Sequence, residues 1–286
     1  MTCIVLVIHH GRPEAAEVAS ELADWALAQG HGVRLPLIDA DRLGRPELGV
    51  PDDELCPGPD VAMSLGGDGT MLRTISLVAE ADVPVIGVNF GQLGYLTAVE
   101  PDRAREGLER FLAGELEVEE RMLLDVDITT RSEALPETHL VALNEAVLEK
   151  TTSGNTVRLD VALEDARFTT YEADGLIVAT PTGSTAYAFS ARGPIVDPSL
   201  RALLLTPVSP HMLFDRTLVL DEAAEVRITV GGHRPAALVV DGRVLGDLEA
   251  GDSVRCRAAG HVARLVVSKP RDFHAILKAK FGLADR

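Results

Sequence analysis

The sequence predicts a doubly wound, Rossmann-like α/β domain at the N-terminus, followed by a β-rich, β-sandwich-like domain. Two patterns lead to this prediction. In the first third of the 286 residues, short apolar runs alternate with segments of helical periodicity, as in parallel sheets covered on both faces. After about Leu116 the runs become β-branched or alternating and are separated by Gly, Asp and Pro, which is typical of antiparallel sheets.

The first domain is expected over residues 1–115. Its elements follow in order: strands at 3–8, 33–38, 61–65 and 83–89, and helices at 14–29, 71–81 and 102–113. Between them, segment 42–59 is rich in Pro, Gly and acidic residues and is expected to be a mobile surface loop. The alternation of strand and helix favours a doubly wound sheet.

The second domain is expected over residues 116–268. Its predicted strands lie at 123–130, 141–149, 157–163, 175–180, 226–230, 237–240 and 262–268. One helix is expected to begin near Ser184, where hydroxyl side chains offer N-cap acceptors. Residues 269–286 are expected to form a C-terminal helix, over Phe273–Phe281, that packs back on the N-terminal domain.

Composition limits the classes of partner. A net charge of −17 argues against binding of nucleic acid or of an anionic membrane, because both need a clustered positive surface. No apolar stretch approaches the roughly 20 residues that span a bilayer, and no basic segment precedes the first apolar run. The three cysteines lie far apart, which indicates reduced thiols. We therefore expect a cytoplasmic protein without nucleic-acid or membrane partners.

A glycine-rich loop carries the strongest sign of chemistry. Gly66, Gly67 and Gly69 lie between a predicted strand and a predicted helix, where the backbone can approach a phosphate closely and free N–H groups point at it. Thr70 follows them. Asp68 would repel phosphates unless it accepts a proton or binds Mg²⁺, so it indicates catalysis. The alternative is a simple Gly-Asp-Gly turn.

Other phosphate and hydrolase motifs are absent from the sequence. It contains no Gly-Lys pair, no third glycine at dinucleotide-fold spacing, and no H-R-D, D-F-G, G-x-S-x-G or H-E-x-x-H string. All four lysines lie at or beyond Lys150, so a phosphate site in the first domain must use arginine, backbone N–H groups or metal. Arg12, after the first strand, and Arg73 are candidates, although a surface role is an alternative for each.

A second group of polar residues lies in the β-rich part. Segment 174–187 runs from Asp174 through a strand to a hydroxyl-rich turn and Tyr187, and it can bond a ribose or pyrophosphate. An ordinary capped helix is the alternative. Asn144 and Glu145 interrupt an apolar strand and can bind a sugar diol or an adenine edge; a solvated strand face is the alternative.

These motifs together resemble the NAD kinases. The resemblance rests on GGDGT at 66–70, NFGQLGYL at 89–96, Asn144-Glu145 and DGLIVATPTGSTAY at 174–187. It continues through Gly193–Val196 and Pro207–His211, so it covers nearly the whole chain. GGDGT alone is shared with lipid kinases, sphingosine kinases and, in related form, phosphofructokinases, whereas the TPTGSTAY string is far more specific.

The resemblance implies an α/β domain and a β domain with NAD held between them, and a homodimer or homotetramer. It implies that Asp68 accepts the proton of the ribose 2′-hydroxyl and that the late turn at Asp241 lies near the phosphate-transfer site. Arg73 matches an arginine that often follows the GGDGT loop, and both Asp68 and Arg73 are expected to contact NAD. The residues that match the family's dinucleotide contacts are Gly69, Asn144, Glu145, Asp174, Thr185, Ala186, Tyr187 and Ser190. Arg192 and Asn155 depart from the family's pattern, which puts contacts at those two positions in doubt.

The expected function is phosphorylation of NAD to NADP, with ATP or polyphosphate as donor and Mg²⁺ or another divalent cation as cofactor. The sequence identifies no metal ligands. The residues expected to bind the donor's phosphates are Gly66, Gly67, Gly69, Thr70, Arg12 and Asp241. Two alternatives are a lipid or sugar kinase, which needs a different acceptor pocket, and a non-catalytic dinucleotide sensor, which would gain from losing Asp68.

Overall fold

The computed structural model describes residues 2–55, 58–91, 94–97, 99–130, 135, 138–268 and 272–283. The chain divides into two compact units. The N-terminal unit comprises Met1–Glu120 and Ala263–Arg286, and the C-terminal unit comprises Arg121–Val262. The domain boundaries expected from the sequence, 115/116 and 268/269, lie near these divisions and stay predictions.

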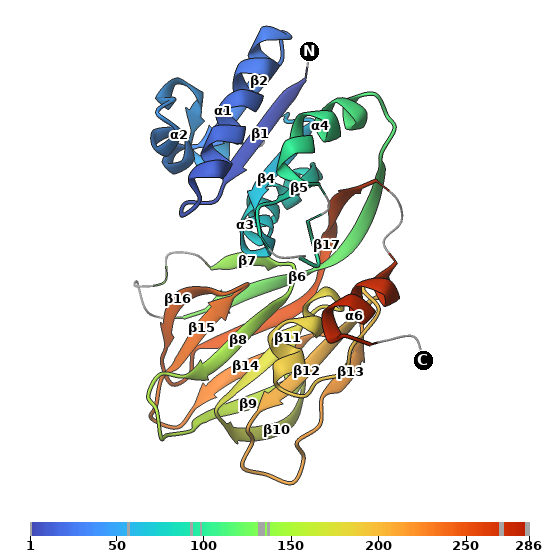
Figure 1. Ribbon diagram of the computed structural model, residues 1–286. Coiled ribbons are helices and arrows are strands. Elements are labelled where there is room, and N and C mark those ends of the chain that lie inside the picture. Colours follow the sequence, from blue (N-terminus) through green and yellow to red (C-terminus); the bar gives the residue numbers. More distant parts are fainter. Residues whose placement is uncertain are drawn as a thin grey trace. The chain divides into compact units, whose positions relative to one another are not determined.

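The N-terminal unit is built on a parallel sheet with strand order β17-β5-β4-β1-β2-β3. Figure 1 labels all of these strands except β3. Its strands are β1 (Cys3–Ile8), β2 (Gly32–Pro36), β3 (Gly49–Val50), β4 (Val61–Gly66), β5 (Pro84–Asn89) and the end of β17 (Ser253–Val267). Its helices are α1 (Pro13–Ala28), α2 (Leu37–Leu43), α3 (Asp68–Val78), α4 (Ala104–Leu112) and α6 (Phe273–Phe281).

Strand order places a ligand site in this unit. The chain builds β1, β2 and β3 in one direction and then returns, because β4 pairs with the other edge of β1. In an open α/β sheet, the carboxyl ends of two such strands leave a crevice at the point of reversal. Ile4–Ile8 of β1 and all of β4 are buried, so the segments after Ile8 and Gly66 start from rigid positions.

The prediction for segment 42–59 is wrong in part. The structure has helix α2, which covers the last residues expected to be strand, then 3₁₀ turns at Pro46–Leu48 and Asp52–Glu54 around β3. Leu55 is fully buried, so hydrophobic contacts order this polar segment. Further 3₁₀ turns lie at Ala79–Ala81 and Pro101–Arg103.

The C-terminal unit contains two sheets of antiparallel pairs. One contains β10 (Ala166–Ala173), β9 (Val157–Leu163), β14 (Val226–Gly231) and β17, with β6 (Glu117–Thr129) pairing β17 and β7 (His139–Ala142). The other has the order β13 (Leu218–Asp221), β12 (Ala202–Val208), β11 (Gly175–Ala179), β8 (Glu145–Lys150), β15 (Ala236–Val240) and β16 (Arg243–Leu248). Buried side chains from both sheets form one core, which is the packing of a β-sandwich. The predicted fold class is confirmed.

Three details of the second unit differ from expectation. The single strand expected at 141–149 is two strands, β7 and β8, which belong to different sheets. Strands β10, β12, β13 and β16 were not predicted. The helix expected near Ser184 is a 3₁₀ turn (Thr182–Thr185) followed by the four-residue α5 (Tyr187–Ser190), and no side chain caps either segment.

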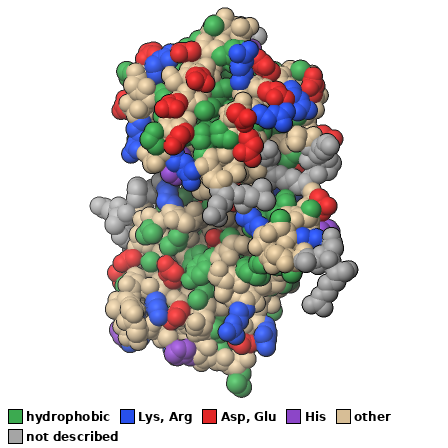
Figure 2. Space-filling model, in the orientation of Figure 1, with side chains coloured by type: hydrophobic (Ala, Val, Ile, Leu, Met, Phe, Trp, Pro, Cys, Tyr) green, Lys and Arg blue, Asp and Glu red, His purple; other side chains and the backbone are tan. Residues whose placement is uncertain are grey.

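The surface carries charged side chains of both signs. On the face drawn in Figure 2, acidic and basic side chains are interspersed over the N-terminal unit. Cys3 and Cys256 are free thiols, whereas Cys56 lies outside the described residues. None of the helices in the described part of the chain combines the length and the apolar character needed to cross a bilayer.

Candidate functional site

The glycine loop connects β4 to α3 at the crevice of the N-terminal sheet. Gly67 is the N-cap of α3 in extended conformation, so the helix begins at Asp68, earlier than the sequence predicts. Because the first N–H groups of a helix have no partner within it, they form a site for an anion together with the helix dipole. Gly69 is exposed in this first turn and Thr70 is buried beneath it.

Asp68 is held by the segment after β5. Its carboxylate oxygens accept hydrogen bonds from the backbone N–H groups of Tyr95 (2.9 Å) and Leu96 (3.1 Å). Gly94 makes this approach possible, since a Cβ atom there would lie 2.2 Å from Oδ1 of Asp68. The carboxylate is only half-buried, so its remaining lone pairs can accept another proton donor. Gln92 and Leu93 of the motif at 89–96 lie outside the described residues.

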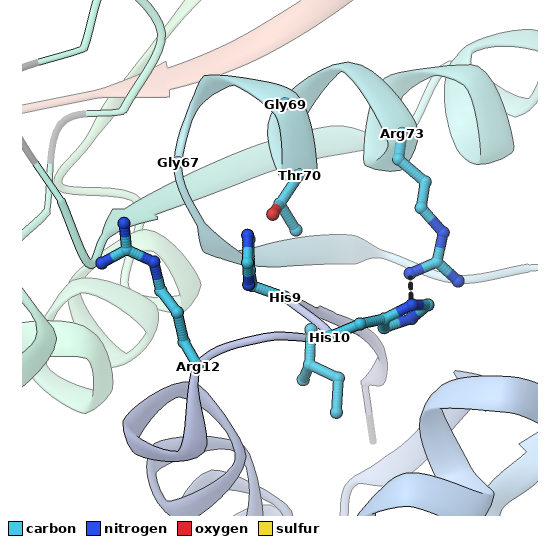
Figure 3. A pocket seen from close by; sticks show the side chains of 8 residues that line it. His9, His10, Arg12, Gly67, Gly69, Thr70 and Arg73 are labelled. Carbon is cyan, nitrogen blue, oxygen red and sulfur yellow. Dashed lines mark hydrogen bonds between the residues drawn. The ribbon is translucent and has the colours of Figure 1, made fainter. Parts of the chain in front are cut away.

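A cationic pocket of about 350 Å³ adjoins the loop (Figure 3). His9, His10 and Arg12 enter it from the segment after β1, and Arg73 enters it from α3. The guanidinium group of Arg12 also donates to the carbonyl of Phe90. The remaining lining residues are Ile8, Gly67, Gly69 and Thr70. Of the residues that the sequence suggested for phosphate in this unit, Arg12, Gly67, Gly69, Thr70 and Arg73 line one pocket, whereas Gly66 does not line it. Their role as a phosphate site stays a prediction.

Asp39 is a pocket-supporting residue that the sequence analysis missed. It lies on α2, is fully buried and bonds both His10 and Arg73. Its segment was expected to be strand and loop, so no pattern singled it out.

In the C-terminal unit, Asn144 and Glu145 lie where the chain passes from β7 to β8. The carboxylate of Asp241, in the turn after β15, accepts the backbone N–H groups of Leu143 (2.7 Å), Asn144 (2.8 Å) and Glu145 (3.1 Å). Asp241 thus fixes the backbone of residues 143–145. The phosphate-binding role expected of Asp241 stays a prediction, and its observed contacts are to the main chain.

Glu145 and Asp241 form a coupled pair of acids. Burial, and then the nearby charge of Asp241, raise the pKa of Glu145 to about 8. Burial raises the pKa of Asp241 to about 6, against the lowering effect of its three N–H bonds. Glu145 is only 7% exposed, and its Oε2 has no hydrogen-bond partner within the described part of the chain. Both carboxyl groups therefore keep their protons to a higher pH than exposed acids do.

The hydroxyl-rich segment uses part of its polar groups internally. The hydroxyl of Thr180 donates to the carbonyl of Leu143, and the hydroxyl of Ser184 bonds both the N–H and the carbonyl of Val196. Gly183 packs on Asn144, whose carbonyl oxygen would lie 2.2 Å from an added Cβ. Backbone contact at Gly183 thus holds the hydroxyl-rich segment against Asn144.

The other predicted dinucleotide residues lie at the start of β11, in the 3₁₀ turn and in α5. The backbone N–H of Tyr187 opposes the rise in the pKa of Glu145, and Asp174 forms an ion pair of 2.7 Å with Lys150. Thr185 and Ala186 are half-buried, whereas Tyr187 and Ser190 are exposed. Burial, and then the negative charges of Glu149, Asp174 and Glu145, raise the pKa of Tyr187. Asp174 lies beside the end of β8 that is far from Glu145, because Gly175 pairs with Glu149 and Ala179 pairs with Glu145.

Comparison with known proteins decides the family. Residues 52–116 match the family model described as the ATP-NAD kinase N-terminal domain, and residues 143–268 match the ATP-NAD kinase C-terminal domain. The NAD kinase of Heliobacterium modesticaldum is 41% identical over 284 residues, which cover 98% of each chain. The chain belongs to the NAD kinase family. It is therefore a phosphotransferase.

Other NAD kinases are similar to this chain in sequence or in structure. The NAD kinase of Geobacter metallireducens is 40% identical over 278 residues, 96% of each chain. Yeast NADH kinase, solved with NADH, has a TM-score of 0.88 at 23% identity and covers 100% of this chain and 89% of its own. An NAD kinase from Archaeoglobus fulgidus, solved with ATP, has a TM-score of 0.72 at 23% identity over 99% of this chain and 100% of its own. These two structures establish the shared fold.

The buried acid of this NAD kinase family member predicts a pH-dependent stability. Because the folded pKa of Glu145, about 8, exceeds its unfolded value near 4.5, the folded protein binds the extra proton and loses stability as pH rises from about 4.5 to about 8. Glu145→Gln removes this loss. We expect it to raise the free energy of unfolding at pH 8 by roughly 1–3 kcal/mol, or several degrees in Tm.

The measurement is thermal unfolding of both proteins between pH 5 and pH 8. The gain in Tm from Glu145→Gln should grow with pH. A gain that is constant or absent across this range would show that Glu145 is ionised in the folded protein throughout.

Proposed function

We propose that this chain transfers the terminal phosphoryl group of ATP to the 2′-hydroxyl of the adenosine ribose of NAD. The observation that carries this proposal is the position of Asp68, an acceptor at the head of α3 beside a pocket of cationic side chains. The reaction named for the relatives, and the ATP bound to the Archaeoglobus fulgidus protein, support it.

Asp68 acts as proton acceptor in this proposal. The 2′-oxygen forms a bond to the terminal phosphorus, the bond from that phosphorus to the bridging oxygen breaks, and ADP leaves. The hydroxyl proton passes to the Asp68 carboxylate. The N–H groups of Tyr95 and Leu96 hold this carboxylate in place. Phosphoryl transfer depends mainly on positioning and on neutralising charge, and the fixed acceptor and the cationic pocket contribute to both.

The donor's phosphates bind in the pocket of the N-terminal unit. Arg12 and Arg73 neutralise their charge, and the N–H groups at the start of α3, in the loop formed by Gly66, Gly67, Gly69 and Thr70, donate to their oxygens. Inorganic polyphosphate presents the same groups and is the alternative donor.

A divalent cation, Mg²⁺ in the first instance, fits this arrangement when shared with the donor. Mg²⁺ keeps several waters and binds through substrate phosphates and one or two carboxylates. Asp68 is a half-buried carboxylate beside the pocket, and the described residues contain no cluster of three metal-binding side chains. When bound, the cation neutralises negative charge on the phosphates.

The acceptor binds through the cluster of the C-terminal unit. Glu145 and Asn144 form hydrogen bonds with the adenosine half of NAD, where the reacting hydroxyl lies. Tyr187 has an exposed ring that can pack against NAD. Asp174, Thr185, Ala186 and Ser190 complete the proposed contacts. The nicotinamide half then needs few contacts.

We also propose that the protein is cytoplasmic and forms a homodimer or homotetramer. Its separated cysteines support the location, and its likeness to NAD kinases supports the assembly. Light scattering after size exclusion tests the assembly, and a monomer would contradict it.

The test of the function is incubation of the purified protein with ATP, Mg²⁺ and NAD, with NADP measured by a coupled dehydrogenase. We expect NADP with NAD, and no product with 2′-deoxy-NAD, which should still bind. Product from a diacylglycerol or a sugar instead would identify a different kinase of this fold, and tight NAD binding without product would identify a sensor.

A further inference from the structure

A buried carboxylate lies beneath the cationic pocket. Asp39 of α2 is 0% exposed. Its oxygens accept the backbone N–H of Ile8 at 2.9 Å, Nε2 of His10 at 2.7 Å, and the two terminal nitrogens of Arg73 at 2.9 and 3.1 Å. One acid of α2 thus connects the end of β1 with the first turns of α3.

Burying the charge of Asp39 costs free energy, which indicates a functional role for this residue beyond folding. A buried ion pair seldom stabilises a fold more than apolar side chains of the same volume, because both charges lose their hydration. The two side chains that Asp39 bonds are the ones that reach into the pocket: those of His10 and Arg73 are 33% and 31% exposed. The charge is therefore placed where it controls these two groups.

The contact with Arg73 fixes the plane of its guanidinium group. Two parallel bonds to one carboxylate restrict the group far more than a single bond does. A terminal nitrogen of Arg73 also meets Nε2 of His10 at 3.1 Å, and the N–H donors that remain are left for a ligand in the pocket, which Arg73 lines. Without the carboxylate, the long side chain would have to order itself when the ligand binds, which lowers affinity.

The contact with His10 fixes its ring. Its Nε2 lies 2.7 Å from Oδ1 of Asp39 and 3.1 Å from a terminal nitrogen of Arg73, the contact marked by the dashed line in Figure 3. Arg42, on the same helix, donates to the carbonyl of His10 at 2.9 Å. Helix α2 therefore holds both the ring and the main chain of His10.

We propose that Asp39 is a positioning residue for the phosphoryl donor: it holds Arg73 and His10 in the geometry that binds the donor's phosphates, and does not touch the donor itself. This inference rests on the proposed function of the pocket. It adds α2, a helix outside the glycine loop, to the donor site.

The test is Asp39→Asn, which keeps the size of the side chain and removes its charge. We expect the KM for ATP to rise about tenfold or more, and the affinity for tripolyphosphate by calorimetry to fall similarly, since a charged pair is lost. The KM for NAD should stay within about twofold, because Asp39 belongs to the donor site. A merely structural role would change both KM values or neither.

Asp24→Asn is the matched control. Asp24 is an exposed acid of α1 that pairs with Arg45, just beyond α2, at 2.7 Å. This substitution removes an acid–arginine pair near the same helix without touching the pocket, so both KM values should stay within about twofold.

Two further variants separate the possible failures. In a protein that carries Arg73→Ala and His10→Ala, adding Asp39→Asn should change the KM for ATP little, because Asp39 acts only by holding those two side chains. If Arg73→Ala leaves ATP and tripolyphosphate binding unchanged, the proposed donor pocket is wrong. If Arg73→Ala weakens binding and Asp39→Asn does not, only the positioning role is wrong. Should Asp39→Asn not fold, Asp39→Glu keeps the charge but displaces it, and an unchanged KM for ATP would equally overturn the proposal.

Discussion

Asp68→Asn is expected to lower kcat by roughly a hundredfold or more, the scale of losing a positioned base. The amide is nearly the same size as the carboxylate, and its oxygen can still accept one of the two N–H bonds from Tyr95 and Leu96. It cannot take the proton of the 2′-hydroxyl. Affinity for NAD should change little, because the proposed contacts to NAD lie largely in the C-terminal unit. Steady-state kinetics and calorimetry measure the two quantities.

The control is Asp82→Asn. Asp82 is another acid of the N-terminal unit, paired with Arg264 at 3.1 Å and 63% exposed, and its left-handed backbone (φ 56°) suits asparagine well. Its substitution should leave kcat within about twofold, as is usual for an exposed pair. Wild-type turnover in Asp68→Asn would show that Asp68 only shapes the loop, and the mechanism would fail.

Local sequence patterns predicted the main strands, the first helix and the glycine loop of the N-terminal unit. The buried runs of β1, β4 and β5 and the glycine loop are contiguous in sequence, and the periodicity of α1 is strong, so each could be recognised alone. Helix α2 was missed because it is short and lies among polar residues, and its order depends on contacts such as those of Asp39 and Leu55 that are distant along the chain.

The site in the C-terminal unit shows a different limit. Asn144, Glu145 and Tyr187 could be named from their motif, but the support of Asn144 and Glu145 by Asp241 joins residues almost one hundred positions apart in the chain. The excess of hydroxyls at 180–185 favoured a ligand, yet Thr180 and Ser184 bond the protein's own backbone. Residue type shows which bonds a side chain can make, and only the fold decides which partner takes them.

Glu145→Ala is expected to weaken NAD binding by roughly ten- to a hundredfold, because one hydrogen bond to a charged group contributes about 1.5–3 kcal/mol. The carboxylate is buried, and its Oε2 lacks a partner among the described residues, so a ribose diol or an adenine edge can supply the missing donor. The KM for ATP should change much less. Glu172→Ala, at an exposed acid of β10, is the control and should bind NAD normally.

The pH dependence of binding gives the sharper form of this prediction. If NAD donates hydrogen bonds to the ionised carboxylate, it must displace the proton that Glu145 holds below pH 8. Affinity should therefore rise with pH by up to about tenfold per unit and level off near pH 8, and NAD binding should release a proton. Glu145→Ala should lose this dependence. Calorimetry in two buffers of different ionisation enthalpy measures the released proton directly. If Glu145→Ala kept wild-type affinity for NAD and instead lost affinity for ATP, β8 would belong to the donor site and the acceptor assignment would be wrong.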